Sequence, residues 1–236
     1  MMRVLILVGG TDGAHDLLGA AQNLQRILGE AYVPAAVGVG LNRFHNPWAP
    51  VRNADVYVIY TMGGSVTEAD QQALDKIVRE GKGAVFLHAS NVPTSDIKQE
   101  EHRLLFDLIG SRFTGHDDFG RFTVEMGEPH PITAGVRDFA IDDEPYVAEW
   151  VGAPCPILAW RTASEERIPV LYARERDLGR VCYLALGHDL RAWGNPAFRR
   201  LLVQATFWAG RAEREDIYRY RQTLWPKEAL QDQEEI

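Results

Sequence analysis

Short unbroken runs of apolar residues alternate, along the first half of the chain, with segments whose apolar residues recur at helical spacing. Residues 3–8, 55–60 and 84–88 form the runs, which are typical of strands covered on both faces of a sheet. Residues 17–28 and 67–80 form the helical segments between them. Alternating strands and helices predict a mainly parallel sheet with right-handed crossovers, and therefore an α/β fold.

The second half of the chain begins with a helix expected near residues 99–109 and then changes in pattern. Short strand-like pieces separated by turns follow, and the last of them is expected to return to the main sheet; they lie near 121–126, 145–150, 156–161, 168–173 and 180–186. An amphipathic helix is expected at 196–209. We therefore expect one domain over residues 1–210 with a strand-rich insertion, and a peripheral helix with a charged tail over residues 211–236.

Composition narrows the classes of function. The 236 residues are 46% hydrophobic, which allows one sizeable core, and the formal net charge of −8 disfavours nonspecific binding to nucleic acid or to an anionic membrane. No apolar run approaches the roughly 20 residues of a membrane span. The apolar N-terminus leads into a polar glycine-rich turn, so we expect a first strand there and not a signal peptide. Two cysteines make no disulfide framework, and a cytoplasmic location is expected.

Histidines and acids gather where the predicted strands end. Ligands of open α/β sheets bind outside the carboxyl ends of the strands. His88 ends the third strand, and two pairs follow the first and the last central strand: His15-Asp16 and His188-Asp189. Two further segments carry the same chemistry, namely the loop with His116 and the pair Asp143-Glu144. Imidazole exchanges protons near neutral pH or binds metals, and a neighbouring carboxylate raises its basicity. These residues are the candidate site.

Each candidate also has a structural interpretation. Asp16 is a good N-cap for the helix that follows it, His88 suits a buried core position, and the Asp143-Glu144 pair suits a solvated turn. Substrate-binding interpretations are open at three more positions. The turn at Gly63-Gly64 offers backbone N–H groups to a polar ligand, and Trp193 offers a ring for stacking on a sugar, but turn geometry and core packing explain them as well. His188, after a buried apolar run, carries the strongest functional interpretation.

Taken together, the chain resembles the trehalose-utilisation (ThuA-like) family, a branch of the class I glutamine amidotransferase-like superfamily. The matching motifs occur in the family's order over nearly the whole chain to about residue 210. They are Gly13-Ala14-His15-Asp16, residues 81–88 (GKGAVFLH), 113–116 (FTGH), 130–133 (HPIT), 143–146 (DEPY) and 179–189 (GRVCYLALGHD). No single motif is diagnostic, whereas the ordered set is fairly specific.

The resemblance implies a flavodoxin-like, doubly wound sheet with a strand-rich insertion. It also implies that His88 stands where glutaminase members carry the nucleophilic cysteine, and that His188-Asp189 falls near the place of the triad histidine. Production of ammonia from glutamine is therefore not expected. The family is linked to the use of trehalose and related disaccharides through keto-sugar intermediates.

Two functions of different classes follow. The first is an enzyme of carbohydrate metabolism that isomerises, eliminates from or hydrolyses a sugar or keto-sugar, with His88, His116, His188, Glu144 and Asp189 as catalytic residues. His15, Asp16, Gly63, Gly64, Asp143 and Trp193 are its expected substrate-binding residues. A divalent metal such as zinc on His88, His116 and His188 is an open cofactor. The alternative is a non-catalytic sugar-binding or scaffold module. A small sugar is the expected partner, and homo-oligomerisation is left open.

Overall fold

The computed structural model describes residues 2–10, 13–62, 66–92, 102–152 and 154–234, with side chains up to residue 224. A nine-stranded sheet runs through it in the order β2-β1-β3-β4-β11-β10-β9-β6-β7. The first five strands pair in parallel; they are β2 (Ala35–Val39), β1 (Val4–Gly10), β3 (Val56–Met62), β4 (Gly83–Leu87) and β11 (Gly179–Leu184). Their carboxyl ends therefore meet at one edge of the sheet, where ligands of such folds bind.

The other four strands extend the sheet with antiparallel pairing. They are β10 (Glu166–Arg176), β9 (Ile157–Ala163), β6 (Gly120–Met126) and β7 (Phe139–Asp143). A separate antiparallel pair joins β5 (Ser111–His116) to β8 (Tyr146–Trp150). The segment 143–146, at the end of β7 and the start of β8, lies at the carboxyl edge of the parallel strands. The side chain of Asp143 holds it there by accepting a hydrogen bond from the backbone N–H of Gly187, after β11.

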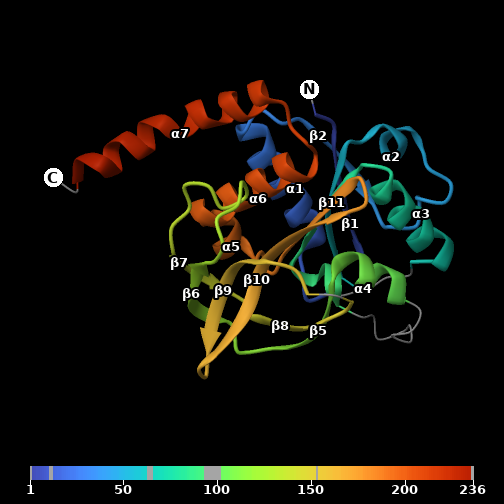
Figure 1. Cartoon of the computed structure of the whole chain (residues 1–236), viewed down its shortest axis with the longest axis horizontal. Helices are drawn as coiled ribbons and strands as arrows, with labels where there is room; N and C mark the ends of the chain where they lie inside the picture. Colours follow the sequence, from blue (N-terminus) through green and yellow to red (C-terminus); the bar gives the residue numbers. More distant parts are fainter. Residues whose placement is uncertain (1, 11–12, 63–65, 93–101, 153, 235–236) are drawn as a thin grey trace.

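Helices cover both faces of the parallel strands (Figure 1). Side chains of β1 alternate between the faces, with Ile6 in one core cluster and Leu7 in the other. The Ile6 face packs on α1 (Leu17–Glu30) and α6 (Pro196–Ala209). The Leu7 face packs on α2 (Ala49–Asn53), α3 (Glu68–Arg79) and α4 (Arg103–Ile109). Because both faces of these strands are buried, their sequences are continuous runs of apolar residues.

Three short or peripheral elements complete the chain. A 3-10 turn, η1 (His88–Asn91), follows β4 directly, and α5 (Leu190–Gly194) precedes α6. The last helix, α7 (Arg214–Glu234), extends away from the body towards the C-terminus (Figure 1), although its Tyr220 is buried against Phe207. The division into residues 1–210 and 211–236 stays a prediction. No described helix is long and apolar enough to cross a membrane.

The α/β prediction is confirmed, and the expected strands and helices are present with shifted ends. Six elements were not expected, because each is short and its apolar residues are few or mixed with polar ones; they are β2, α2, η1, β5, β7 and α5. The helix expected from residue 99 is described from Arg103 onwards, and residues 99–101 lie outside the described residues. The narrower description of the sheet as flavodoxin-like with an insertion stays a prediction.

Candidate functional site

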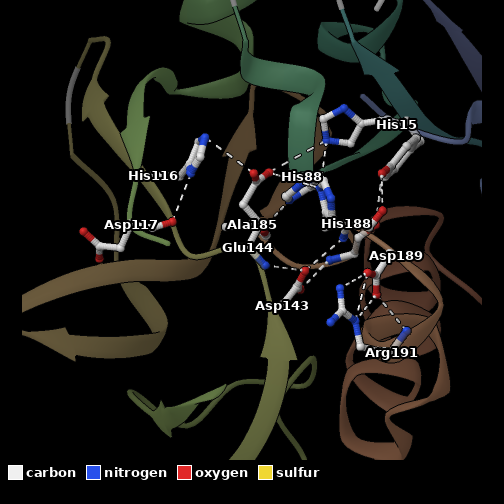
Figure 2. A network of polar contacts seen from close by, with 12 residues as sticks. His15, His88, His116, Asp117, Asp143, Glu144, Ala185, His188, Asp189 and Arg191 are labelled. Carbon is white, nitrogen blue, oxygen red and sulfur yellow. Dashed lines mark hydrogen bonds and ion pairs between the residues drawn. The ribbon is translucent and has the colours of Figure 1, made fainter. Parts of the chain in front are cut away.

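Three imidazole nitrogens and one carboxylate oxygen converge at the carboxyl edge of the parallel strands (Figure 2). We call this group the His/Glu cluster; its atoms are His15 Nε2, His88 Nε2, His188 Nδ1 and Glu144 Oε2. All four lie within 4.8 Å of one another. His188 Nδ1 is central, because it lies 3.2 Å from His15 Nε2, 3.4 Å from His88 Nε2 and 3.1 Å from Glu144 Oε2.

Four separate elements carry these side chains. His15 lies in the loop between β1 and α1, His88 opens η1 after β4, Glu144 follows β7, and His188 follows β11. Parallel strands place the first, second and fourth loops at the same sheet edge, and β7 delivers the acid from the antiparallel extension. His15 and His88 are buried, whereas Glu144 and His188 are partly exposed. The cluster is therefore a prearranged group of titratable atoms that solvent or a small ligand reaches from one side.

His88 is held in an unusual backbone conformation. Its φ of 42° is in the left-handed region, which a residue with a Cβ adopts at some cost. Tyr183 offsets that cost by donating from its hydroxyl to the His88 carbonyl at 2.9 Å. On the ring, Nδ1 lies 2.9 Å from the carbonyl oxygen of Ala185. A carbonyl only accepts, so Nδ1 carries the hydrogen, and Nε2 of the neutral ring presents a lone pair to the cluster.

Asp143 fixes the two segments on which Glu144 and His188 lie. It is fully buried, and its carboxylate accepts the backbone N–H groups of Gly187 at 2.8 Å, His188 at 3.0 Å and Glu144 at 2.9 Å. Burial raises the pKa of Asp143, against the opposing effect of His88 and of these three N–H groups. Asp143 itself does not belong to the His/Glu cluster. It lies beneath the cluster and holds the backbone that carries Glu144 and His188.

Glu144 is the anion of the site. Burial by itself raises the pKa of its carboxyl, but the hydrogen bond from His88 and the charges of His188, His88 and His116, which exist when these rings are protonated, outweigh burial and lower this pKa to about 2. The carboxylate is therefore ionised at neutral pH. Its two oxygens face different partners, since Oε2 belongs to the His/Glu cluster and Oε1 lies 3.5 Å from His116 Nε2. Glu144 thus connects the buried histidines to a more exposed one.

His116 lies outside the His/Glu cluster, on the far side of Glu144 (Figure 2). Its side chain is 46% exposed, and its Nδ1 lies 3.0 Å from the carbonyl oxygen of Asp117. As with His88, the carbonyl accepts, so Nε2 of the neutral ring carries the lone pair. Its ring stacks on Tyr146 at a centroid distance of 6.3 Å. His116 therefore offers a base that faces both the cluster and solvent.

Arg161 braces this side of the site, although sequence reasoning did not find it. The arginine in β9 is 3% exposed, forms an ion pair with Asp117 at 2.9 Å and donates to the carbonyl of Pro145 at 3.0 Å. It thereby ties the loop of His116 to the loop of Glu144. The signal in the sequence was a charged residue inside the strand-like piece 156–161, where burial demands partners.

Aromatic and charged side chains form the rim. Phe119 is partly exposed, its ring centroid lies 5.9 Å from that of His188, and the guanidinium carbon of Arg191 lies 3.6 Å from its centroid. Tyr60 is buried beneath the site and donates to the Gly187 carbonyl at 3.0 Å. No motif marked these residues, because they come from loops and strands far apart in the sequence.

The other sequence-based candidates lie beside the cluster or away from it. Asp16 accepts from Gly19 N as the N-cap of α1, and Asp189 accepts from Arg191 N as the N-cap of α5. Trp193 is 3% exposed and packs against Tyr60 and Phe198. A ring buried to that degree leaves no face on which a sugar stacks. Gly63 and Gly64 lie outside the described residues.

Comparisons with known proteins agree on the family. The ThuA family model, described as trehalose utilisation, matches residues 3–209. A ThuA-like protein from Parabacteroides merdae superposes with a TM-score of 0.71 at 18% identity, over 89% of this chain and 90% of that one. A second, from Bacteroides uniformis, has a TM-score of 0.71 at 16% identity, over 88% and 91%. No curated protein matches the sequence.

A third similar structure belongs to a much longer chain. The cold-adapted β-galactosidase from Rahnella sp. R3 has a TM-score of 0.66 at 15% identity, and the match covers 91% of this chain but only 32% of that one. At these identities the similarity to solved structures shows the fold alone, and the family model carries the assignment.

Proposed function

Because the chain belongs to the trehalose-utilisation (ThuA) family, we propose that it is an enzyme of carbohydrate metabolism that acts on a sugar or keto-sugar. The His/Glu cluster and His116 are its active site in this proposal. The observation that carries it is the convergence of three histidines and one low-pKa carboxylate, from four separate loops, at the edge of the sheet where α/β proteins bind ligands. A scaffold has no need of four ionisable groups at such short distances.

The arrangement supports proton transfer next to a ketone. His116 Nε2 removes the proton from the carbon beside the carbonyl, the C–H electron pair forms a carbon–carbon double bond, and the carbonyl electrons move onto oxygen as an enediolate. A hydrogen carried by an imidazole nitrogen of the His/Glu cluster bonds to that oxygen and stabilises its negative charge. The enediolate then reforms the ketone and expels a glycosidic oxygen from the next carbon, and this oxygen takes the proton held by His116. Addition of water to the resulting alkene gives net hydrolysis.

Return of the proton to the former carbonyl carbon, with transfer of the neighbouring hydroxyl proton to the former carbonyl oxygen, gives isomerisation from the same enediolate. Glutaminase activity forms no part of the proposal, because His88 and not a cysteine occupies the turn after β4. Cys182 is buried within β11, and Cys155 packs against the core cluster on the Leu7 face of the sheet. As the location we propose the cytoplasm, since both cysteines are free, and as the partner we propose a small sugar.

The test is turnover of 3-keto-disaccharides by the purified protein, followed by chromatography of the released sugar. His116→Gln is expected to lower kcat by about 10²–10⁴-fold, the range of a lost general base. His130→Gln is the matched control, because His130 packs against Trp208 away from the cluster, and it is expected to retain wild-type activity. No turnover of any keto-disaccharide by the wild-type protein, or equal rates for the two variants, would contradict the proposal.

The alternative is a non-catalytic sugar-binding module, which would need a different kind of site. Such a module presents an exposed aromatic platform and has no reason to gather histidines. Trp193 is buried, and Phe119 at the rim is covered on one face by Arg191. These two observations favour the enzyme. Tight binding of a keto-disaccharide that is never converted would favour the module.

A further inference from the structure

We infer that the His/Glu cluster binds one divalent transition-metal ion of the type that prefers imidazole nitrogen, with zinc as the model ion. The ligand atoms are His15 Nε2, His88 Nε2, His188 Nδ1 and Glu144 Oε2. The inference deepens the proposed function and rests on it only for the role of the ion in catalysis. It differs from the set expected from sequence, because His15 and Glu144 take the place of His116.

Four of the six distances between the ligand atoms match a tetrahedral site. Zinc lies about 2.0–2.1 Å from nitrogen or oxygen ligands, so the ligand atoms of a regular tetrahedron are about 3.3 Å apart. His188 Nδ1 lies 3.2 Å from His15 Nε2, 3.4 Å from His88 Nε2 and 3.1 Å from Glu144 Oε2. Glu144 Oε2 lies 3.4 Å from His88 Nε2 and 4.0 Å from His15 Nε2. The sixth distance, from His15 Nε2 to His88 Nε2, is at most 4.8 Å, so a rotation of the His15 side chain would bring all four atoms to one central ion.

Hydrogen bonds among the four ligand atoms satisfy them less completely than one bound cation would. His88 Nε2 presents a lone pair, since Nδ1 of the same ring donates to Ala185 O at 2.9 Å. The carboxylate oxygen Oε2 of Glu144, which lies 3.4 Å from His88 Nε2, is a second acceptor. A hydrogen on His188 Nδ1 reaches one neighbour at a time, although three lie within 3.4 Å of it. A central dication contacts all four donors at once and removes the repulsion among their lone pairs.

The chemistry of the donors selects the ion. Three neutral imidazoles with one carboxylate suit zinc, nickel, iron or copper, whereas magnesium and calcium require sites made of oxygen. The surroundings have the form found around metal ligands, in which the second ring nitrogen donates to a backbone carbonyl, as His88 does to Ala185. Asp143 adds to this by holding the backbone of both His188 and Glu144.

The position of the site agrees with a catalytic ion. Catalytic zinc ions keep a position for water or substrate and sometimes expand to five ligands. A ketone oxygen would enter here as an additional ligand from the partly exposed side of the cluster, at Glu144 and His188. A bound dication would polarise that oxygen and stabilise the enediolate, while His116, outside the ligand set, remains free to move the proton.

The experiment measures binding of zinc and of cobalt by metal-free protein. Calorimetric titration with zinc chloride is expected to give one site per chain, and cobalt is expected to give the visible absorption bands of a tetrahedral ion. His15→Ala and His188→Ala are expected to weaken zinc binding by about 100-fold or more, since each removes a ligand and loss of a mere second-shell partner already costs about 10–100-fold. Far-UV circular dichroism confirms that each variant is folded.

His116→Gln is the matched control, and it is expected to bind zinc as the wild type does. The inference is overturned if folded metal-free protein binds neither ion, or if both ligand variants bind zinc with wild-type affinity. Full keto-sugar turnover by the metal-free protein overturns the catalytic role assigned to the ion and leaves the proposed function intact. One tightly bound zinc in a protein that converts no keto-sugar supports this inference and contradicts the proposed function.

Discussion

Nδ1 of His88 donates to the backbone carbonyl of Ala185 at 2.9 Å, and this single hydrogen bond sets which nitrogen of the ring faces the site. Ala185 lies directly after β11, the strand that pairs in parallel with β4 and its terminal residue Leu87. The orientation of His88 is therefore a consequence of the register of two neighbouring strands.

His88→Asn is expected to lower keto-sugar turnover by about 10²-fold or more, because asparagine is too short to place an atom where Nε2 lies. Its side-chain amide retains a donor towards the Ala185 carbonyl, so we expect a smaller effect on folding than on activity. Steady-state rates and thermal melts of the same preparation check both. A variant that unfolds while its residual folded fraction has full specific activity would show that His88 is only structural.

Asp143→Asn is expected to lower the free energy of unfolding by about 1–3 kcal/mol. The amide replaces one carboxylate oxygen by an NH₂ group that faces a backbone N–H of Gly187, or those of His188 and Glu144. Asp142→Asn is the matched control, since the side chain of Asp142 is 45% exposed and pairs with Arg121 at 3.5 Å; its effect should stay within about 0.5 kcal/mol. Urea unfolding measures both, and equal effects would contradict the assigned role of Asp143.

Arg161→Met is expected to reduce kcat more than it raises KM, because the arginine acts through the two loops that it ties together. The substitution removes the hydrogen bond from Arg161 to the buried Pro145 carbonyl and the ion pair with Asp117, at a cost of about 1–3 kcal/mol of stability, although this carbonyl still accepts the N–H of Asp117 at 3.3 Å. Arg121→Met, which removes an exposed pair, is expected to cost under about 1 kcal/mol. A shift in the pH profile of kcat in Arg161→Met alone would separate positioning of His116 from general loss of stability.

Gly187→Ala is expected to destabilise the protein by more than about 1 kcal/mol. Gly187 has a φ of +119°, and an added Cβ would lie 3.3 Å from Trp193 and 3.4 Å from Phe198. Gly194→Ala provides the comparison, because a Cβ there meets nothing within 4 Å; in α5 it should be neutral or stabilise by about 0.4–1 kcal/mol. Thermal melts decide, and an equally stable Gly187→Ala protein would contradict the strain argument.

Acid is expected to remove a contribution to stability that Asp70 makes at neutral pH. Burial alone raises the pKa of Asp70, but hydrogen bonds from Thr67, His45 and Phe44 outweigh burial and lower it. A lowered folded-state pKa stabilises the protein above the unfolded value of about 3.9, and the contribution is lost as the pH falls through the folded value. Urea unfolding of wild type and Asp70→Asn between neutral and acidic pH measures it. The variant should lose less stability on acidification, and parallel curves would contradict this.

The sequence determined the strands, the helices between them and the edge at which the histidines gather. Apolar runs such as residues 3–8 are specific because both faces of a parallel strand are buried, and parallel strand ends necessarily meet. His88 and His188 were therefore placed together although 100 residues separate them. The position of β7 was not predictable in the same way, because its short segment ends in two acids that resemble a solvated turn.

The tertiary structure alone decided the membership of the site. Asp143 and Glu144 are adjacent in sequence, yet one is a buried support and the other is the anion of the cluster, because the chain bends between β7 and β8 and directs their side chains to different partners. His15 joins the His/Glu cluster, whereas His116 faces it across Glu144. Spacing along the chain carries no information on such choices. They depend on ring tautomers, rotamers and strand register, which are set only when the loops pack against one another.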